Sequence, residues 1–132
     1  VTKTWSTNTH KFKNSQKILM EKNSIIYAKT SSNNSILSSK NLNKNYTLSC
    51  GCVGFSGAKR SSSQAAQVLG EAYGDYLQSQ NVNDIIVVFN GIGKGRRAII
   101  KGFIKKNIRI KKIVEKTSQS HNGCRSKKKR RI

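Results

Sequence analysis

At 132 residues the chain has room for one compact domain with extensions, and it carries 26 Lys and Arg against five Asp and Glu, a formal charge of +21. A charge this one-sided opposes folding of the free chain and needs a polyanion to neutralise it. A membrane surface is disfavoured because the sequence has neither an apolar run of about 20 residues nor a basic amphipathic helix with large apolar residues opposite, so nucleic acid is the expected partner.

Residues 1–22 are polar and basic, with apolar residues at no regular period. This pattern predicts a basic N-terminal extension that orders only on a partner. No secretory or Arg-rich transit segment is recognisable in it, so we expect any address tag to be absent or removed.

Three short β-type runs follow the extension. The first begins at residues 25–27, the second contains residues 36 and 37, and a polar loop over residues 40–45 separates it from the third. The third run alternates at period two over Tyr46, Leu48, Cys50 and Cys52. We therefore expect three antiparallel strands, with Cys50 and Cys52 on one face of the last.

A basic loop rich in Gly and Ser, GFSGAKRSSS, precedes the first predicted helix. It supplies turn residues, cations and helix caps but is not expected inside a regular element. The helix should begin at Ser61 or Ser62, because Ser61 and Gln64 have the spacing of a capping box. Its apolar stripe comprises Ala65, Val68, Leu69, Ala72, Tyr73, Tyr76 and Leu77. A second row holds only small residues, where another backbone or a partner can approach: Ala66, Gly70 and Gly74.

The second half of the domain predicts strand, helix and strand. The apolar run 85–89 suits a central strand buried on both faces. A helix is expected from Arg96 to Ile104, with an inward face made of Ile99, Ile100, Phe103 and Ile104. The final strand contains Ile108, Ile110, Ile113 and Val114. The expected fold is α/β, a mixed sheet of three antiparallel strands followed by α-β-α-β, with one domain over residues 23–115.

The last 17 residues, 116–132, hold seven cations, no acid and almost no apolar side chain, which predicts a basic C-terminal tail.

Upstream, the GIGKGRR segment follows a buried strand and opens a helix, so it gathers free backbone N–H groups and three cations at one point. This predicts an anion site, with RNA phosphate as the favoured ligand and a plain strand-to-helix turn as the alternative. The spacings of a dinucleotide fingerprint and of a P-loop are not met.

Metal binding and catalysis are disfavoured by residue placement. Cys50, Cys52, His121 and Cys124 have poor spacing for zinc, and cysteines that share a strand face more often pack in the interior. Three cysteines form no even disulfide framework, which favours a reducing compartment. The five acids are too scattered to hold the divalent metals of a ribonuclease H-type enzyme. We therefore expect no enzyme, no metal, no cofactor and no small-molecule substrate.

Three motifs, GFSGAKRSSSQAAQV, VVFNGIGKGRRAIIKGF and HNGCRSKKKRRI, together resemble the universal ribosomal protein S-eleven family of the small subunit, from about Ile25 to the C-terminus. The resemblance implies a ribonuclease H-like fold without catalytic acids. It also implies a structural role on the platform of the small ribosomal subunit, beside the mRNA exit side, where the family binds small-subunit rRNA and touches neighbouring platform proteins. The alternative function is nonspecific binding of nucleic acid by a protein that is free of the ribosome.

The chain departs from the family in its prolines, which the family usually has at the positions of Ser63, Ile92, Lys94, Ser118, Ser120, Ser126 and Lys127. This chain has no proline at all, so its free tail should be more flexible. Lost prolines and a composition with A/T-rich codons favour a mitochondrial member, in a matrix ribosome. The alternative is the cytoplasm of a bacterium with an A/T-rich genome.

The expected RNA-binding residues fall in a polar turn, the two glycine loops and the tail. They are Asn33, Asn34, Phe55, Ser56, Lys59, Arg60, Lys94, Arg96, Arg97, His121, Asn122, Arg125, Lys127, Lys128, Lys129, Arg130 and Arg131. Lys and Arg would neutralise phosphates, and Phe55 or His121 would stack on an exposed base. We also expect Gly93→Val to impair docking, by adding bulk where the backbone must approach RNA and by disfavouring any positive φ there.

Overall fold

The structure is a computed structural model that describes residues 24–39, 45–129 and 131. The expected extension at residues 1–22 and all but the last residue of the expected loop at 40–45 lie outside these ranges. The elements are β1 (Ser24–Thr30), β2 (Ser35–Ser39), β3 (Thr47–Ser49), the short 3₁₀ helix η1 (Gly57–Ser61), α2 (Ser63–Ser79), β4 (Asp84–Asn90), α3 (Arg96–Lys105) and β5 (Arg109–Glu115).

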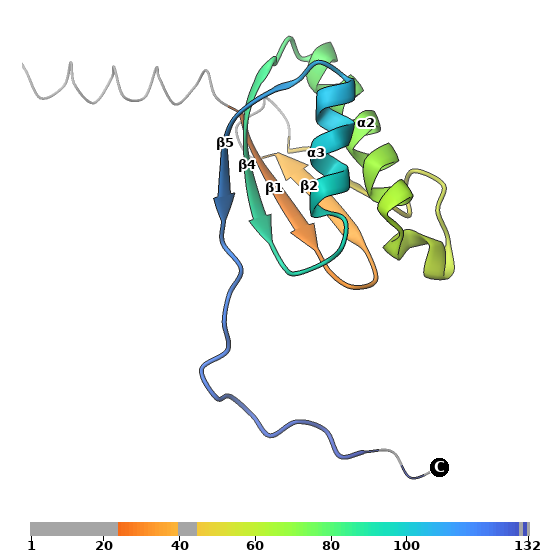
Figure 1. The fold of residues 1–132 in the computed structure, drawn as a ribbon, viewed down its shortest axis with the longest axis vertical. Helices are drawn as coiled ribbons and strands as arrows, with labels where there is room; N and C mark the ends of the chain where they lie inside the picture. Colours follow the sequence, from red (N-terminus) through yellow and green to blue (C-terminus); the bar gives the residue numbers. More distant parts are fainter. Residues whose placement is uncertain (1–23, 40–44, 130, 132) are drawn as a thin grey trace, which may run out of the picture.

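The five strands form one mixed sheet in the order β3-β2-β1-β4-β5. β1 pairs antiparallel with β2, and β2 pairs antiparallel with β3. β4 lies parallel to both β1 and β5. The predicted mixed sheet and its order of three antiparallel strands, then α-β-α-β, are confirmed. Both crossover helices lie side by side on one face of the sheet (Figure 1), as right-handed connections in the same direction require.

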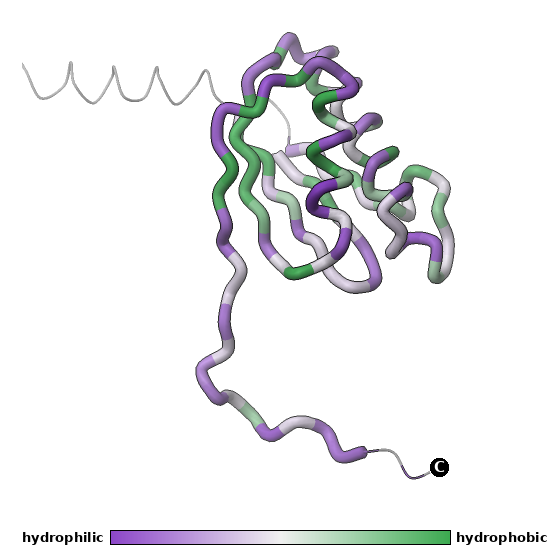
Figure 2. Tube along the Cα trace, viewed as in Figure 1, coloured by the Kyte–Doolittle hydropathy of each residue, from purple (hydrophilic) through white to green (hydrophobic). Residues whose placement is uncertain are grey.

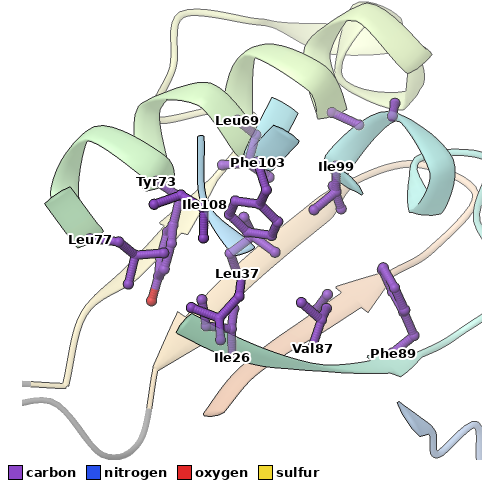
Figure 3. Packing of buried hydrophobic residues seen from close by; sticks show 14 of the residues in the cluster. Ile26, Leu37, Leu69, Tyr73, Leu77, Val87, Phe89, Ile99, Phe103 and Ile108 are labelled. Atoms are coloured by element: carbon purple, nitrogen blue, oxygen red, sulfur yellow. The ribbon is translucent and has the colours of Figure 1, made fainter. Parts of the chain in front are cut away.

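The core lies between that sheet face and the two helices (Figure 3). Ile26 and Ala28 on β1 and Val87 and Phe89 on β4 point to the helices because alternate residues of a strand share one face. They meet side chains of α2 and α3, among them Leu69, Tyr73, Leu77, Ile99 and Phe103. Among the described residues no helix covers the other sheet face, so Ile86 is only partly buried and β4 is not fully buried on both faces.

Tyr73 brings a polar group into this core. Its hydroxyl donates to the carbonyl oxygen of Tyr46 at 3.0 Å, and the ring of Tyr46 stacks on that of Tyr76 with centroids 3.8 Å apart. Burial raises the pKa of Tyr73 to about 12, so its hydroxyl stays protonated and keeps this hydrogen bond at neutral pH. The bond ties α2 to the chain that enters β3.

The predicted row of small residues on α2 is where α3 crosses. A Cβ on Gly102 of α3 would lie 2.5 Å from the carbonyl oxygen of Gln67 and 2.9 Å from the Cα of Gly70. A Cβ on Gly70 would in turn lie 2.8 Å from the carbonyl oxygen of Ile99. The two helix backbones are therefore in direct contact, and only glycine fits at their crossing point.

The predicted alternation of the third strand through Cys52 is wrong. β3 ends at Ser49, and residues 50–54 form turns in which Cys52 N donates to Ser49 O at 3.0 Å. Gly54 adopts a φ of +93°, a conformation that a strand cannot continue through. Cys50 is therefore buried in the core while Cys52 is exposed, and the two thiols do not share a strand face.

The start of α2 and the inward face of α3 also differ from the sequence prediction. Ser62, not Ser61, caps α2: its hydroxyl accepts from Ala65 N at 3.1 Å, so the predicted capping box of Ser61 and Gln64 is wrong. Ser61 instead ends η1, a short helix inside the loop where no element was expected. Ile104 is 61% exposed rather than inward-facing: the buried residues of α3 are Ala98, Ile99, Gly102 and Phe103, and Ile100 is only partly buried against the core.

Candidate nucleic-acid interface

The turn between β1 and β2 and the loop between β4 and α3 lie next to each other at one edge of the sheet (Figure 1). β1 and β4 are parallel neighbours, so their carboxyl ends meet there. Gly93 N donates to Thr30 O at 3.1 Å, and Ser31 closes the turn by accepting from Asn34 N at 3.1 Å. This contact brings the predicted residues Asn33 and Asn34 beside the loop that carries Lys94.

The glycines of this loop are required by the chain's own packing. Gly91 has a φ of +103°, and a Cβ there would collide with the carbonyl oxygen of Thr30. A Cβ on Gly93 would collide with the carbonyl oxygen of Ser31, and Gly93 is not among the glycines with positive φ. The expected effect of Gly93→Val therefore has a different cause: the added side chain breaks the packing of two loops, whether or not RNA is present.

Arg96 is held by its own chain. Its Nη2 donates to both carboxylate oxygens of Glu115 at 2.5 Å and to the Thr117 hydroxyl at 3.2 Å, and its guanidinium lies 5.6 Å from the centre of the Phe89 ring. The Thr117 hydroxyl, which also bonds to Glu115, and then Arg96 lower the pKa of Glu115 below its ordinary value. Gly91 N donates to that same hydroxyl at 3.1 Å. Arg96 thus joins the start of the tail to the glycine loop.

Lys94 and Arg97 are exposed and point to a groove of about 530 Å³ between α2 and α3. Lys101 and Lys105 continue the same wall, since residues four apart lie on one face of a helix. The opposite wall contains Ser63, Gln64, Gln67 and Glu71. No ion pair joins Lys94, Arg97 or Lys101 to an acid within the part of the chain that the structure describes.

The one carboxylate of this groove is already engaged. Glu71 accepts from Lys105 Nζ at 3.0 Å and from Gln67 Nε2 at 3.1 Å, and the Lys105 bond is the largest cause of its lowered pKa. The groove therefore keeps a net positive wall formed by Lys94, Arg97 and Lys101. The amides of Gln64 and Gln67 were not predicted, because a groove between two helices depends on their packing; only the four-residue spacing of cations on α3 indicated its other wall.

The first glycine loop is a second group of predicted residues. Lys59 and Arg60 are exposed on η1, directly before the N-terminus of α2. Ser56 is exposed, whereas Phe55 is partly buried and packs against the core. Phe55 therefore contributes to packing and has only part of its ring open to a base.

The tail is a third group of predicted residues. Residues 116–129 and 131 contain no helix or strand and are exposed, and the chain leaves the end of β5 as an extended, largely hydrophilic segment (Figures 1 and 2). It carries His121, Asn122, Arg125, Lys127, Lys128, Lys129 and Arg131, while Arg130 lies outside the described residues. Lys116 N donates to Phe89 O at 2.8 Å, so the tail departs from beside the glycine loop.

The sequence profile described as ribosomal protein S11 matches residues 24–131. Small ribosomal subunit protein uS11m of Prototheca wickerhamii is 33% identical over 120 residues, which cover 89% of this chain and 94% of that protein. The chain belongs to the ribosomal protein S11 family.

Other S11 proteins show similar agreement. Small ribosomal subunit protein uS11 of Orientia tsutsugamushi (strain Boryong) is 31% identical over 110 residues, covering 82% of this chain and 87% of that protein. Small ribosomal subunit protein uS11c of Tupiella akineta is 32% identical over 124 residues, covering 91% of this chain and 95% of that protein. The S11 match includes the two glycine loops, the α2–α3 groove and the tail as far as Arg131, and membership gives the chain a structural role in the small ribosomal subunit.

The described residues form neither a metal cluster nor a membrane-spanning helix. In residues 24–39, 45–129 and 131, no three or more His, Cys, Asp and Glu side chains gather where they could hold a metal ion. No helix in those ranges is long and apolar enough to cross a membrane.

Proposed function

We propose that this S11 protein binds small-subunit rRNA on the platform of the small ribosomal subunit, near the mRNA exit side and beside neighbouring platform proteins. The observation that carries the proposal is the α2–α3 groove, whose wall of Lys94, Arg97 and Lys101 has no acid paired to it among the described residues. Phosphate oxygens supply the negative charge that such a wall needs. The exposed cations of η1 and of the tail add positive charge on two further segments.

The two walls of the groove support different contacts. The cations of α3 neutralise phosphates, which positions the RNA without selecting its sequence. Gln64 and Gln67 on α2 offer amide donors and acceptors to ribose hydroxyls or base edges. Cations on three separate segments suit a folded RNA that surrounds the protein, and fit less well with a single groove of a duplex.

A non-catalytic role is supported by the state of the acids. Each of the four described carboxylates is in an ion pair: Glu71 with Lys105, Asp75 with Lys106, Asp84 with Lys111, and Glu115 with Arg96. They are spread over α2, β4 and β5 and do not gather at one point, whereas ribonuclease H-type chemistry needs carboxylates gathered around metal ions. We propose that the fold is ribonuclease H-like in strand order and pairing, with the catalytic acids absent.

We also propose that the protein works in a mitochondrial ribosome. The relatives include mitochondrial, chloroplast and bacterial types, which is compatible with a mitochondrion or a bacterium. The A/T-type composition and the absence of proline favour the organelle. Fractionation of the cells that naturally make the protein would test the mitochondrial location. Recovery of the protein with the cytoplasmic ribosomes of a bacterium would contradict it.

The rRNA proposal is tested by the salt dependence of binding to full-length small-subunit rRNA. The triple variant Lys94→Ser, Arg97→Ser, Lys101→Ser should flatten the slope of log K against log salt by about 2 units, at roughly 0.7 per phosphate contact. The control removes three cations away from the groove: Lys29→Ser, Arg109→Ser, Lys112→Ser. Equal loss of slope in the two variants would show that the groove has no special role.

A further inference from the structure

A second groove, of about 540 Å³, lies between α3 and β5 on the flank of α3 away from α2. Five isoleucines and three cations line it: Ile100, Ile104, Ile108, Ile110, Ile113, Arg109, Lys111 and Lys112. We call these five side chains the isoleucine groove. The proposed rRNA contacts do not use it.

A β-bulge in β5 creates the isoleucine groove. Ile110 pairs with Ile85, but Lys112 pairs with the next residue, Ile86, so Lys111 is the extra residue. Ile113 therefore pairs with Val87, and both Ile110 and Ile113 turn to the helix side, where Ile85 and Val87 are buried. Without the bulge, two residues three apart on a strand would face opposite sides.

The groove is more apolar than a free surface favours. Ile104 is 61% exposed and Ile113 is 53% exposed, and they are two of the four large hydrophobic side chains exposed in the described part of the chain. Apolar side chains gathered on a surface with a polar rim mark an interaction site, whereas single exposed ones are ordinary. The apolar face is therefore expected to be covered in the assembled particle.

The charges of the rim select the occupant. Arg109 and Lys112 are exposed, Lys111 pairs with Asp84 at 2.9 Å, and no acid is among the lining residues. RNA matches the cations but not the isoleucines, and no aromatic ring lines the groove to stack on a base. A second copy of the chain would bring another +21 charges, and residues 1–23 carry five Lys and one Glu, so neither complements the rim.

We propose that the isoleucine groove receives a segment of another protein of the small subunit, one that presents a row of apolar side chains flanked by Asp or Glu. Apolar residues fill the space between α3 and β5, and the carboxylates meet Arg109 and Lys112 at the rim. The bulge and the lysines of β5 disfavour simple addition of a strand along this edge, so side-chain insertion supplies the contact. The inference uses only membership in the small subunit and does not depend on the rRNA contacts of the other groove.

Photo-crosslinking in assembled small subunits tests the proposal. A benzophenone amino acid is placed at position 104 or 113 of the full chain, and at position 92 as the control, because Ile92 is 88% exposed on the glycine loop. Positions 104 and 113 should link to one peptide of another protein that contains apolar residues next to Asp or Glu. Links to rRNA, to a second copy, to residues 1–23 of the same chain, or to nothing would overturn it.

The control position keeps the two proposals separate. Position 92 should link to rRNA if the proposed function is correct. If position 92 fails while 104 and 113 link to a protein, the rRNA contact of the loop is refuted and the isoleucine groove stands.

A second measurement places negative charge in the isoleucine groove and follows how well the crosslinked protein is retained. Ile104→Asp with Ile113→Asp should weaken retention of the crosslinked protein in the particle by roughly tenfold or more, the size expected when central anchors are lost. Arg109→Glu should weaken it too, whereas Gln80→Asp, an acidic change at an exposed residue that lines neither groove, should not. Because Ile104 and Ile113 are exposed, an unchanged far-ultraviolet circular dichroism spectrum is expected; equal retention in all variants would contradict the proposal.

Discussion

At the scale of single residues, the side chains of Arg96, Glu115 and Thr117 form a hydrogen-bonded cluster that connects the glycine loop to the first residues of the tail. We call this cluster the latch. Arg96 Nη2 bonds to Glu115 at 2.5 Å, and Thr117 bonds to both Glu115 and the backbone N of Gly91. The sequence indicated Arg96 as a phosphate ligand because it lies in a basic loop. Its pairing with Glu115, 19 residues later, depends on β4 and β5 being parallel neighbours, which local sequence does not determine.

The latch predicts the behaviour of one carboxyl group. Thr117→Val removes the hydroxyl that contributes most to the lowered pKa of Glu115, so that pKa should rise toward its ordinary value of 4.5. A lowered folded-state pKa means that ionised Glu115 stabilises the fold above pH 4.5, and that this contribution is lost as the pH falls through the lowered value. NMR titration of the Glu115 side chain measures it, with Ser118→Ala as control. A parent pKa at or above 4.5 would refute the latch.

A second prediction at this scale concerns Gly93. Gly93→Ala should lower the free energy of unfolding by about 1–3 kcal/mol or more, the usual cost of forcing extra atoms into a packed site, because its Cβ would collide with Ser31 O. Gly123→Ala is the matched control, since nothing lies within 4 Å of its Cβ. Urea unfolding measures both. Normal stability combined with lost RNA binding would instead indicate direct contact between Gly93 and RNA.

At the scale of elements, the parts set by local periodicity were predictable and those set by packing partners were not. The apolar stripe of α2 follows its three-four spacing, and Leu69, Tyr73 and Leu77 are buried as predicted. The end of β3 was missed because alternation continued through the cysteines, while the turn depends on Gly54 at positive φ. The exposure of Ile104 and the bulge at Lys111 depend on which neighbours α3 and β5 meet.

The crossing of α2 and α3 gives the prediction at this scale. Gly102→Ala should destabilise the protein. Overpacking costs about 1–3 kcal/mol of stability, which is more than the roughly 0.5–1 kcal/mol that alanine gains over glycine in a helix. Its Cβ would lie 2.5 Å from Gln67 O. Lys101→Ala, an exposed change one residue earlier on α3, should alter stability by no more than about 0.5 kcal/mol. Equal melting temperatures of the two variants would show that the α2 and α3 backbones can move apart at little cost.

At the scale of the whole molecule, charge and shape divide the protein into a folded domain and an exposed tail. The composition predicted a nucleic-acid partner, in agreement with the rRNA association that membership of the S11 family implies, and the second glycine loop supplied Lys94 and Arg97 of the groove. The groove walls contributed by Gln64, Gln67 and Lys101 required the packing of two helices. Sequence motifs therefore located the cations of the loops, and only the fold shows which of them face one groove.

The tail should add affinity with little choice of sequence, because exposed cations sense phosphate charge before base edges. Replacing residues 127–131 by Ser should flatten the slope of log K against log salt by about 2 to 3.5 units, if three to five of them contact phosphate. Circular dichroism should be unchanged, since the described residues of this segment make no contact with the core. An unchanged slope would place the tail in solvent.

The central claim, that the protein is held in the small subunit by rRNA, is tested most directly by sedimentation. The tagged full chain, expressed at its natural level, is followed through a density gradient at moderate salt, alongside the variant Lys94→Ser, Arg97→Ser, Lys101→Ser. We expect the parent chain to sediment with the small subunit and the variant to be released at a lower salt concentration. A parent chain that stays at the top of the gradient, with none in the small subunit, would show that rRNA does not hold the protein there.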